Sequence, residues 1–358
     1  MNHTEHESSI IGPDDLILIT GAAGFIGWRV VQNLLDRGFR NLRCFARRRN
    51  AAGRFEALRR QYPGARVEVL EGNLLSPDDC RLATKDAAVI FHLAAGRGEK
   101  LVPDAFLNSV VTTRNLLEAC LQQRCVVRRF VNISSFAVYT NARKPRWRML
   151  DESCPVEAHP EVRGDAYTFA KVKQDELVVD YGKKTGIPYV IVRPGYVYGP
   201  GAGTAVAGRV GTGAFGLYLH LGGSNPIPLS YIDNCADAIA LAGLQPGIDG
   251  EVFNVVDDDL VSSRRFLRLY KRHVARFKSV YLPKAVSYLL FYLWERYSAS
   301  SQGQLPPAYN RSVWHAYWKK TCYSNKKLKA RLGWAPKVST EEGLRRFFEA
   351  CRVGGANA

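Results

Sequence analysis

The sequence predicts an α/β protein with a doubly wound, mostly parallel β-sheet and a smaller, mainly helical C-terminal region. Two observations support this fold class. Up to Arg193, short apolar runs rich in β-branched residues alternate with segments of helical periodicity, which is the pattern of βαβ units. After Arg193 this alternation stops, and residues 257–358 are mainly helical in pattern.

Each predicted strand is a short apolar run bounded by turn residues, as expected for strands buried on both faces. The runs cover residues 16–20, 42–46, 66–71, 88–94, 129–134, 189–193 and 251–256. Helical periodicity is clearest in 26–37, 109–124 and 167–185. The glycine-rich segment 198–223 is typical of a loop with a short helix, and 229–244 of a further strand and helix.

The composition limits the classes of protein to which the chain can belong. Of its 358 residues, 46% are apolar and 23% are charged, which is the balance of a globular protein. The eight cysteines include no CxxC pair, so the sequence predicts neither a metal site nor a redox pair. The longest apolar run, 285–294, is shorter than the ~18 residues of a membrane span. The N-terminus lacks a signal-peptide core, so we expect a cytoplasmic protein.

A glycine-rich turn follows the first predicted strand and opens the first predicted helix. Its cofactor-contacting residues would be Gly21, Ala23, Gly24, Phe25, Ile26 and Gly27. Glycines let the backbone approach a diphosphate closely, and the helix N-terminus offers free N–H groups to it. The strand–turn–helix context therefore predicts a Rossmann-type dinucleotide site.

Residues near the ends of the second and third strands bear on the choice of cofactor. Arg47 and Arg48 follow the second strand, where an acidic residue would suit a free ribose 2′-hydroxyl. Arginine suits a 2′-phosphate instead, so we favour NADP(H), with NAD(H) as the alternative. Asn73 either hydrogen-bonds the adenine or serves as a turn residue.

A tyrosine and a lysine four residues apart form the candidate acid/base pair. Tyr167 and Lys171 share one face of a predicted helix. A nearby ammonium favours the phenolate, and the lysine can reach ribose hydroxyls. Ser134 and Ser135 end the fifth predicted strand, where a hydroxyl can hydrogen-bond a substrate oxygen.

These motifs resemble the extended short-chain dehydrogenase/reductase superfamily, in its NAD-dependent epimerase/dehydratase group. The resemblance covers nearly the whole chain and is carried by TGAAGFIG (20–27), FHLAA (91–95), NISSFAVY (132–139), YTFAK (167–171), RPGYVYGPG (193–201) and YIDNCADAIALA (231–242). It implies a catalytic trio of Ser135, Tyr167 and Lys171, and a homodimer formed through helices. The further expected cofactor contacts are Leu74, Leu93, Ala94, Ala95, Lys171, Arg193 and Pro194.

Departures from the sugar-nucleotide pattern point to one branch of this superfamily. Phe136 and Ala137 stand where the 4,6-dehydratases carry an acid and a base. Tyr196 replaces an asparagine, and Leu229 and Ser230 replace an Arg-Asp pair that holds a nucleotide diphosphate. The chain is more similar to the 3β-hydroxysteroid dehydrogenase and dihydroflavonol reductase branch.

This branch implies hydride transfer to or from a hydroxyl or ketone carbon of an apolar, sterol-, lipid- or polycyclic-like small molecule. Phe136 and Tyr196 are its expected substrate-binding residues, unless they simply pack in the core. A nucleotide-sugar epimerase is the alternative, and a non-catalytic cofactor-binding regulator is a second one. We expect an NAD(P)-binding domain over 13–198 and 229–256, a substrate-binding region over 199–228 and 257–350, and flexible termini at 1–12 and 351–358.

The net charge of +17 favours an anionic partner. No zinc-finger, RNA-recognition or basic-zipper pattern is present, so no specific nucleic-acid partner is predicted. Residues 261–280 contain seven Lys or Arg and no acidic residue, with apolar residues at helical spacing. This predicts a basic amphipathic helix. Together with 285–294 it either docks peripherally on an anionic membrane or packs on the substrate region with a solvated basic face.

Overall fold

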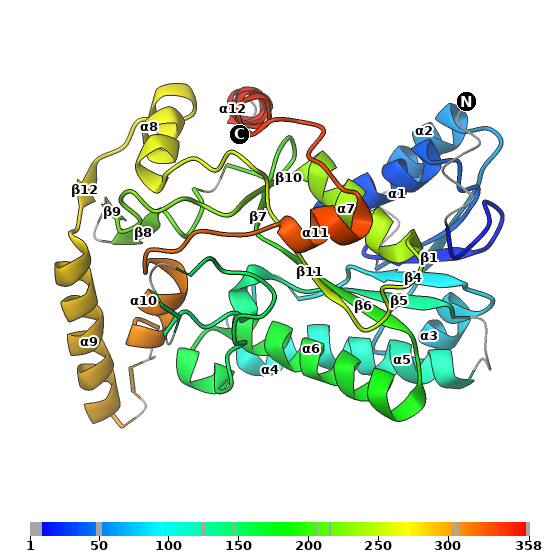
Figure 1. Ribbon diagram of the computed structural model, residues 1–358, viewed down its shortest axis with the longest axis horizontal. Coiled ribbons are helices and arrows are strands. Elements are labelled where there is room, and N and C mark those ends of the chain that lie inside the picture. Colours follow the sequence, from blue (N-terminus) through cyan, green and yellow to red (C-terminus); the bar gives the residue numbers. More distant parts are fainter. Residues whose placement is uncertain are drawn as a thin grey trace.

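A single parallel sheet organises the N-terminal two thirds of the chain (Figure 1). The computed structural model describes residues 9–47, 52–96, 98–99, 101–122, 127–142, 144–145, 148–204, 206–214, 216–302, 304–305 and 308–355. The strand order is β11-β6-β5-β4-β1-β2-β3, and every pairing in this sheet is parallel. The strands are β1 (Ile17–Thr20), β2 (Asn41–Ala46), β3 (Arg66–Glu71), β4 (Val89–His92), β5 (Arg129–Ile133), β6 (Tyr189–Pro194) and β11 (Val252–Val255). All seven predicted strands are confirmed.

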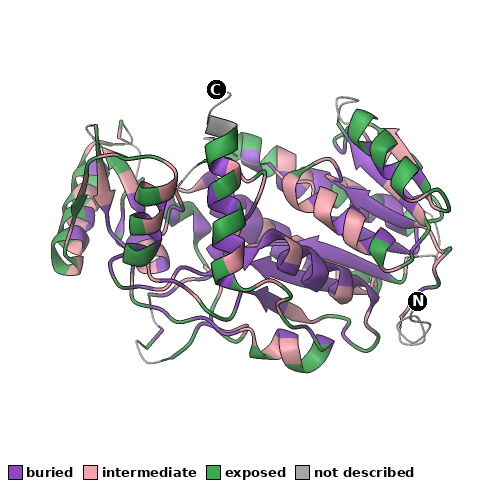
Figure 2. Ribbon diagram, turned by 90° about the horizontal axis from the view of Figure 1, so that it is seen from above, coloured by how far each residue is buried: buried purple, intermediate pink, exposed green. Residues whose placement is uncertain are grey.

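Helices cover both faces of this sheet, so the predicted doubly wound architecture is confirmed (Figure 1). One face carries α1 (Phe25–Asp36), α2 (Ala52–Gln61), α7 (Ile232–Leu244) and α11 (Lys326–Leu332). The other carries α3 (Pro77–Thr84), α4 (Val102–Phe106), a π-helical turn (Leu107–Val111), α5 (Thr112–Gln122) and α6 (Ala166–Thr185). Two buried apolar layers result, one on each face of the sheet. They rank among the most buried parts of the molecule (Figure 2).

The chain order places the cofactor edge of the sheet. It moves outward from β1 through β2 to β3 and then returns to β4 on the other side of β1. The carboxyl ends of β1 and β4 therefore meet at a topological switch point, where open α/β sheets bind their ligands.

The second region contains more strand than the sequence predicts. Its helices are α8 (Ser263–His273), α9 (Lys284–Ser300), α10 (Arg311–Tyr317) and α12 (Thr340–Gly355). Two small sheets join them: β7 (Tyr196–Tyr198) with β10 (Leu229–Tyr231), and β8 (Gly211–Ala214), β9 (Leu217–His220) and β12 (Ser279–Tyr281). The expected loop with short helix over 198–223 is wrong in part, because β8 and β9 form an antiparallel hairpin there.

Two expected boundaries also differ from the structure. The basic helix predicted over 261–280 begins at Ser263 and ends at His273. α12 continues beyond the boundary expected at 350, and Cys351 is buried in it. Of the cysteines in the described ranges, Cys322 is exposed and the others are buried.

Candidate active site

The glycine-rich turn between β1 and α1 forms the centre of the site. Gly21 has φ +69°, and a Cβ added there would lie 3.0 Å from the Ala94 backbone nitrogen. A Cβ at Gly27 would lie 2.2 Å from the Gly21 carbonyl oxygen. Gly24 caps α1 without a side-chain hydrogen bond, so the first N–H groups of the helix are free to bind a diphosphate. The turn therefore fits the predicted dinucleotide site.

A cavity of about 690 Å³ extends from this turn along the ends of β1, β2 and β4. Most of the predicted cofactor residues line it: Gly21, Ala23, Gly24, Arg47, Asn73, Leu74, Leu93, Ala94 and Ala95. Arg48 lies outside the described residues. The Asn73 amide oxygen accepts a hydrogen bond from the Leu75 backbone N–H, so the structure gives this residue a turn role.

Arg54 is a cavity residue that the sequence analysis missed. It projects from α2 and lines the same cavity as Arg47, with its guanidinium 4.2 Å from the centre of the Trp28 ring. Among the described residues that line this cavity, none is Asp or Glu. Arg47 and Arg54 therefore make this end of the cavity cationic. The position of Arg54 within a predicted helix gave no signal that its side chain would reach the cavity.

A second cavity of about 220 Å³ holds the predicted catalytic residues together. Ser135, Tyr167 and Lys171 line it with Phe25, Ile26, Gly27 and Pro194. Gly21, Gly24, Leu93 and Ala95 line both cavities, so the two are continuous along the sheet edge. The structure thus brings the glycine turn and the trio into one site.

The N-terminal part of α6 positions the acid/base pair. The Asp165 carboxylate caps the helix by accepting hydrogen bonds from the Tyr167 N–H and the Thr168 hydroxyl. One turn later the Lys171 ammonium is buried, and it donates to the Ile133 carbonyl (2.6 Å) and to the Gln174 side chain (2.8 Å). Burial lowers the pKa of Lys171 to about 8, while the Asp175 carboxylate acts to raise it.

The two adjacent serines have different surroundings. Ser135 is partly exposed to the cavity, and its hydroxyl oxygen accepts from the Ala137 N–H at the start of a short 3₁₀ turn. The Ser134 hydroxyl is buried and donates to the Asp175 carboxylate at 2.8 Å. This geometry leaves the Ser135 hydroxyl free to donate toward the cavity.

Asp175 anchors a buried polar network that the sequence analysis missed. Its carboxylate accepts from Asn132, Ser134 and Arg193, the last at 3.0 Å. Burial raises the pKa of Asp175, and the Arg193 guanidinium opposes this shift. Arg193 was expected to contact the cofactor, and the structure shows its guanidinium paired with Asp175. Asp175 lies four residues after Lys171 on one face of α6, and this spacing could have indicated its role.

A second buried network links Lys171 to the start of the glycine turn. The Gln174 amide donates to the Thr113 hydroxyl, which itself donates to the Ser109 carbonyl. His92 contacts Thr113 through Nε2 and Thr20 through Nδ1. Burial lowers the pKa of His92 to about 3, so its ring is neutral. Because the Thr113 hydroxyl proton is already used, Nε2 of His92 is the donor and Nδ1 the acceptor.

The two expected substrate residues differ in their surroundings. Phe136 is buried, with ring centres 5.8 Å from Tyr139 and 5.5 Å from Tyr323. It therefore packs in the core rather than lining the catalytic cavity. Tyr196 is partly buried in β7, and its backbone N–H donates to the Pro228 carbonyl.

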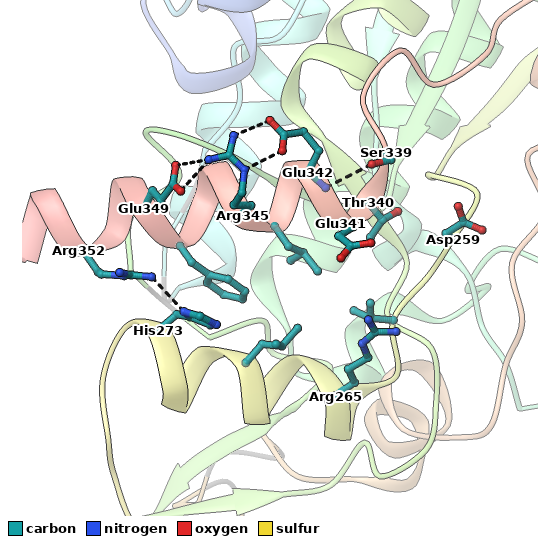
Figure 3. A pocket seen from close by; sticks show the side chains of 14 residues that line it. Asp259, Arg265, His273, Ser339, Thr340, Glu341, Glu342, Arg345, Glu349 and Arg352 are labelled. Carbon is teal, nitrogen blue, oxygen red and sulfur yellow. Dashed lines mark hydrogen bonds and ion pairs between the residues drawn. The ribbon is translucent and has the colours of Figure 1, made fainter.

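A separate cavity of about 710 Å³ lies between α8 and α12 (Figure 3). Arg345 pairs there with Glu342 and Glu349, and Arg352 donates to His273. These exposed charges largely neutralise one another. No tyrosine, lysine or glycine lines this cavity in the described chain, so it lacks the machinery of the sheet-edge site.

A doubly wound sheet with a glycine turn and a Ser, Tyr and Lys cluster at its switch point defines a nicotinamide-dinucleotide enzyme of the Rossmann type. Residues 17–255 match the family model described as the NAD dependent epimerase/dehydratase family. The chain belongs to this family, and it is an NAD-dependent oxidoreductase or epimerase of the extended short-chain dehydrogenase/reductase superfamily.

Known proteins resemble the chain over much of its length. It is 27% identical to sterol-4-alpha-carboxylate 3-dehydrogenase, decarboxylating, of Saccharomyces cerevisiae, over 92% of this chain and 96% of that one. It is 33% identical to a 3 beta-hydroxysteroid dehydrogenase/Delta 5→4-isomerase of Mycobacterium tuberculosis, over 52% and 48% of the two chains. UDP-glucuronic acid 4-epimerase of Bacillus cereus, solved with UDP-glucuronic acid and NAD, shares the fold with a TM-score of 0.69 and 22% identity, covering 94% and 99%.

Proposed function

We propose that this enzyme transfers hydride between a nicotinamide cofactor and a hydroxyl or ketone carbon of an apolar, sterol-, lipid- or polycyclic-like substrate. The observation that carries the proposal is the single cavity lined by Ser135, Tyr167, Lys171 and the glycine turn. The sterol dehydrogenase that matches nearly the whole chain supports the apolar substrate. The nicotinamide, when bound, supplies the hydride chemistry.

Each residue of the trio has a distinct task in this proposal. Tyr167 moves the proton of the substrate hydroxyl, because its partly buried side chain lines the cavity at the start of α6. Lys171 places a positive charge near the phenol and holds the ribose. Ser135 donates its hydroxyl proton to the substrate oxygen, which fixes the reacting carbon beside the cofactor.

Replacing Tyr167 by Phe tests this assignment. We expect turnover to fall by about 10²–10⁴-fold, the usual contribution of a positioned acid/base group, with cofactor affinity nearly unchanged. The substrate is first sought by thermal shift with NADP(H) or NAD(H) plus sterols, apolar ketones and UDP-sugars, since any ligand of the native state raises Tm. Cofactor absorbance then reports turnover, and full turnover in Tyr167→Phe would refute the role.

A nucleotide-sugar epimerase is the second candidate function. The solved relatives that hold UDP-sugars with NAD support it at the level of fold. Against it, Leu229 and Ser230 are fully buried, and Ser230 donates to the Val255 carbonyl. They therefore offer no charged clamp for a diphosphate. A Tm increase with a UDP-sugar, beyond that of the cofactor, would make epimerisation the better assignment.

For the cofactor we favour NADP(H), because Arg47 and Arg54 line the end of the cavity near β2. We expect Arg47→Ala with Arg54→Ala to weaken NADP(H) binding at least about tenfold more than NAD(H) binding, since guanidinium groups pair with a 2′-phosphate. Titration calorimetry measures both affinities. Arg60→Ala, an exposed site on α2, is the matched control. Equal losses for the two cofactors would remove the basis for NADP(H).

We also propose that the enzyme is a homodimer that pairs through α4 and α6. Four exposed apolar residues at the two ends of α4, from its N-cap to the first residue of the π-helical turn, form what we call the α4 surface: Leu101, Val102, Phe106 and Leu107. Phe106 lies 6.4 Å from Phe169 of α6, measured between ring centres, so these residues share one surface with α6. Such an apolar patch on adjacent helices suits an isologous interface.

A further inference from the structure

The helix α9 presents two faces of opposite character. Its inner face packs on α10 through aromatic contacts: Phe291 lies 5.2 Å from Trp318, and Tyr288 lies 5.0 Å from Trp314, between ring centres. The Trp314 indole also donates to the Ser287 hydroxyl at 3.0 Å. These contacts fix the rotation of α9 about its axis, and therefore which residues face outward.

The outer face of α9 is an exposed apolar stripe, which we call the α9 arc. It consists of Val286, Leu289, Leu290, Leu293 and Tyr297, whose exposed fractions lie between 45% and 62%. Their spacing of three, four, seven and eleven residues from Val286 keeps them on one side of the helix. α9 forms an outer edge of the molecule (gold, Figure 1). Nothing in the described part of the chain covers the arc.

A cationic segment lies next to the arc. Residues 264–284, which we call the cationic segment, contain eight Lys or Arg and no Asp or Glu. In α8 the apolar residues Phe266, Leu267 and Tyr270 are buried in the core, so this helix exposes its cations and not its apolar face. The Arg264 guanidinium lies 5.3 Å from the ring centre of Tyr281. Tyr281 and Val280, both exposed in β12, lead directly into α9.

We propose that the α9 arc and the cationic segment form a docking surface for an anionic phospholipid membrane. The arc would enter the boundary between headgroups and acyl chains, with α9 lying in the plane of the interface. The cations of α8, with Arg276 and Lys278 of the segment between α8 and β12, would contact lipid phosphates. Docking is peripheral, since no helix in the described ranges is long and apolar enough to cross a membrane.

The charge pattern favours this occupant over a second copy of the chain. An isologous contact through the α9 arc would bring two cationic segments together, and like charges across an interface oppose association. An anionic membrane instead complements both features at once. The inference rests on the proposed function in one respect: docking would give the enzyme access to an apolar substrate dissolved in the bilayer. Its test needs no activity, so either idea can fail alone.

Vesicle co-sedimentation of the full-length enzyme tests the proposal. We expect binding to phosphatidylcholine vesicles that contain about 30% phosphatidylserine, and weaker binding to pure phosphatidylcholine or at high salt. Leu289→Glu with Leu293→Glu should lower the partition coefficient at least about tenfold. Leu82→Glu is the control, because this leucine of α3 is 60% exposed and lies outside the surface.

A second pair of variants separates the electrostatic part from the apolar part. Arg268→Glu with Arg272→Glu should abolish the preference for phosphatidylserine, whereas Lys183→Glu on α6 should retain it. Absence of binding to the anionic vesicles at low salt would overturn the proposal. An equal loss of vesicle binding in Leu82→Glu would also overturn it. Sedimentation velocity that shows a dimer held together by the α9 arc would overturn it as well.

Discussion

At the residue scale, the buried ammonium of Lys171 makes the stability of the fold depend on pH. Burial lowers its pKa to about 8, whereas the ordinary value in an unfolded chain is 10.5. Between these two pH values the unfolded state binds more protons than the folded state, so this group makes the free energy of unfolding rise with pH. Below about pH 8 both states carry the charge, and the folded state bears the full cost of burying it.

We therefore expect wild type to gain up to about 3 kcal/mol of stability relative to Lys171→Met as the pH rises from about 8 to about 10.5. Urea unfolding of the cofactor-free protein measures this difference. Lys183→Met removes an exposed lysine of the same helix. Its free energy of unfolding should change with pH in parallel with that of wild type. If the free energies of unfolding of wild type and Lys171→Met also changed in parallel with pH, the burial of the Lys171 charge would be contradicted.

The sequence predicts those site residues whose relations are local. Tyr167 and Lys171 are one helical turn apart, and the glycines of the first turn need only their neighbours to define it. The role of Arg193 could not be predicted in this way, because its partner Asp175 comes from another element. Burial of that pair depends on how α6 packs against β6, which no local spacing encodes.

At the element scale, the contact between α1 and the glycine turn should be sensitive to a single methyl group. In Gly27→Ala the new Cβ would lie 2.2 Å from the Gly21 carbonyl oxygen, so α1 must move away from the turn that holds the diphosphate. We expect NAD(P)(H) affinity to fall at least about tenfold and stability to fall by about 1–3 kcal/mol. Titration calorimetry and thermal unfolding measure the two effects.

A helical glycine elsewhere provides the control for this substitution. A Cβ added at Gly53 in α2 meets no atom within 4 Å, so Gly53→Ala should stabilise the protein by up to about 1 kcal/mol through helix propensity. If Gly27→Ala bound cofactor as well as wild type, close packing would not be the reason for glycine at this position.

In the C-terminal region, pairing between distant strands sets where helices and strands end, and the helical spacing of apolar residues does not. The helical pattern of 261–280 continues past His273, yet Ser279 and Tyr281 pair with Tyr218 and His220 of β9. Strand pairing with a distant segment thus ends α8 early. The same strand, β9, forms the hairpin in the glycine-rich segment that was expected to be a loop. The parallel sheet was predictable because its strands are buried on both faces and read as continuous apolar runs.

At the scale of the whole molecule, two exposed apolar surfaces lie on different elements and suit different partners. The α9 arc adjoins a segment with eight cations and no anion. The α4 surface lies on the opposite side of the parallel sheet from α1 and α7 (Figure 1), and Asp104 and Glu99 lie near it in the sequence. Because fewer cations lie near the surface at α4 than near the α9 arc, two copies would repel one another less at α4. A dimer formed through α4 and α6 would therefore leave α9 free for a membrane.

This arrangement predicts how single substitutions change the oligomeric state. We expect wild type to sediment as a dimer and Phe106→Glu as a monomer, because a twofold interface buries the substituted carboxylate of each copy without a partner. Leu82→Glu, exposed on α3, should remain dimeric in sedimentation velocity. A monomeric wild type would contradict the dimer. A dimer that survives in Phe106→Glu but dissociates in Leu289→Glu with Leu293→Glu would locate the interface at α9, and would contradict membrane docking there as well.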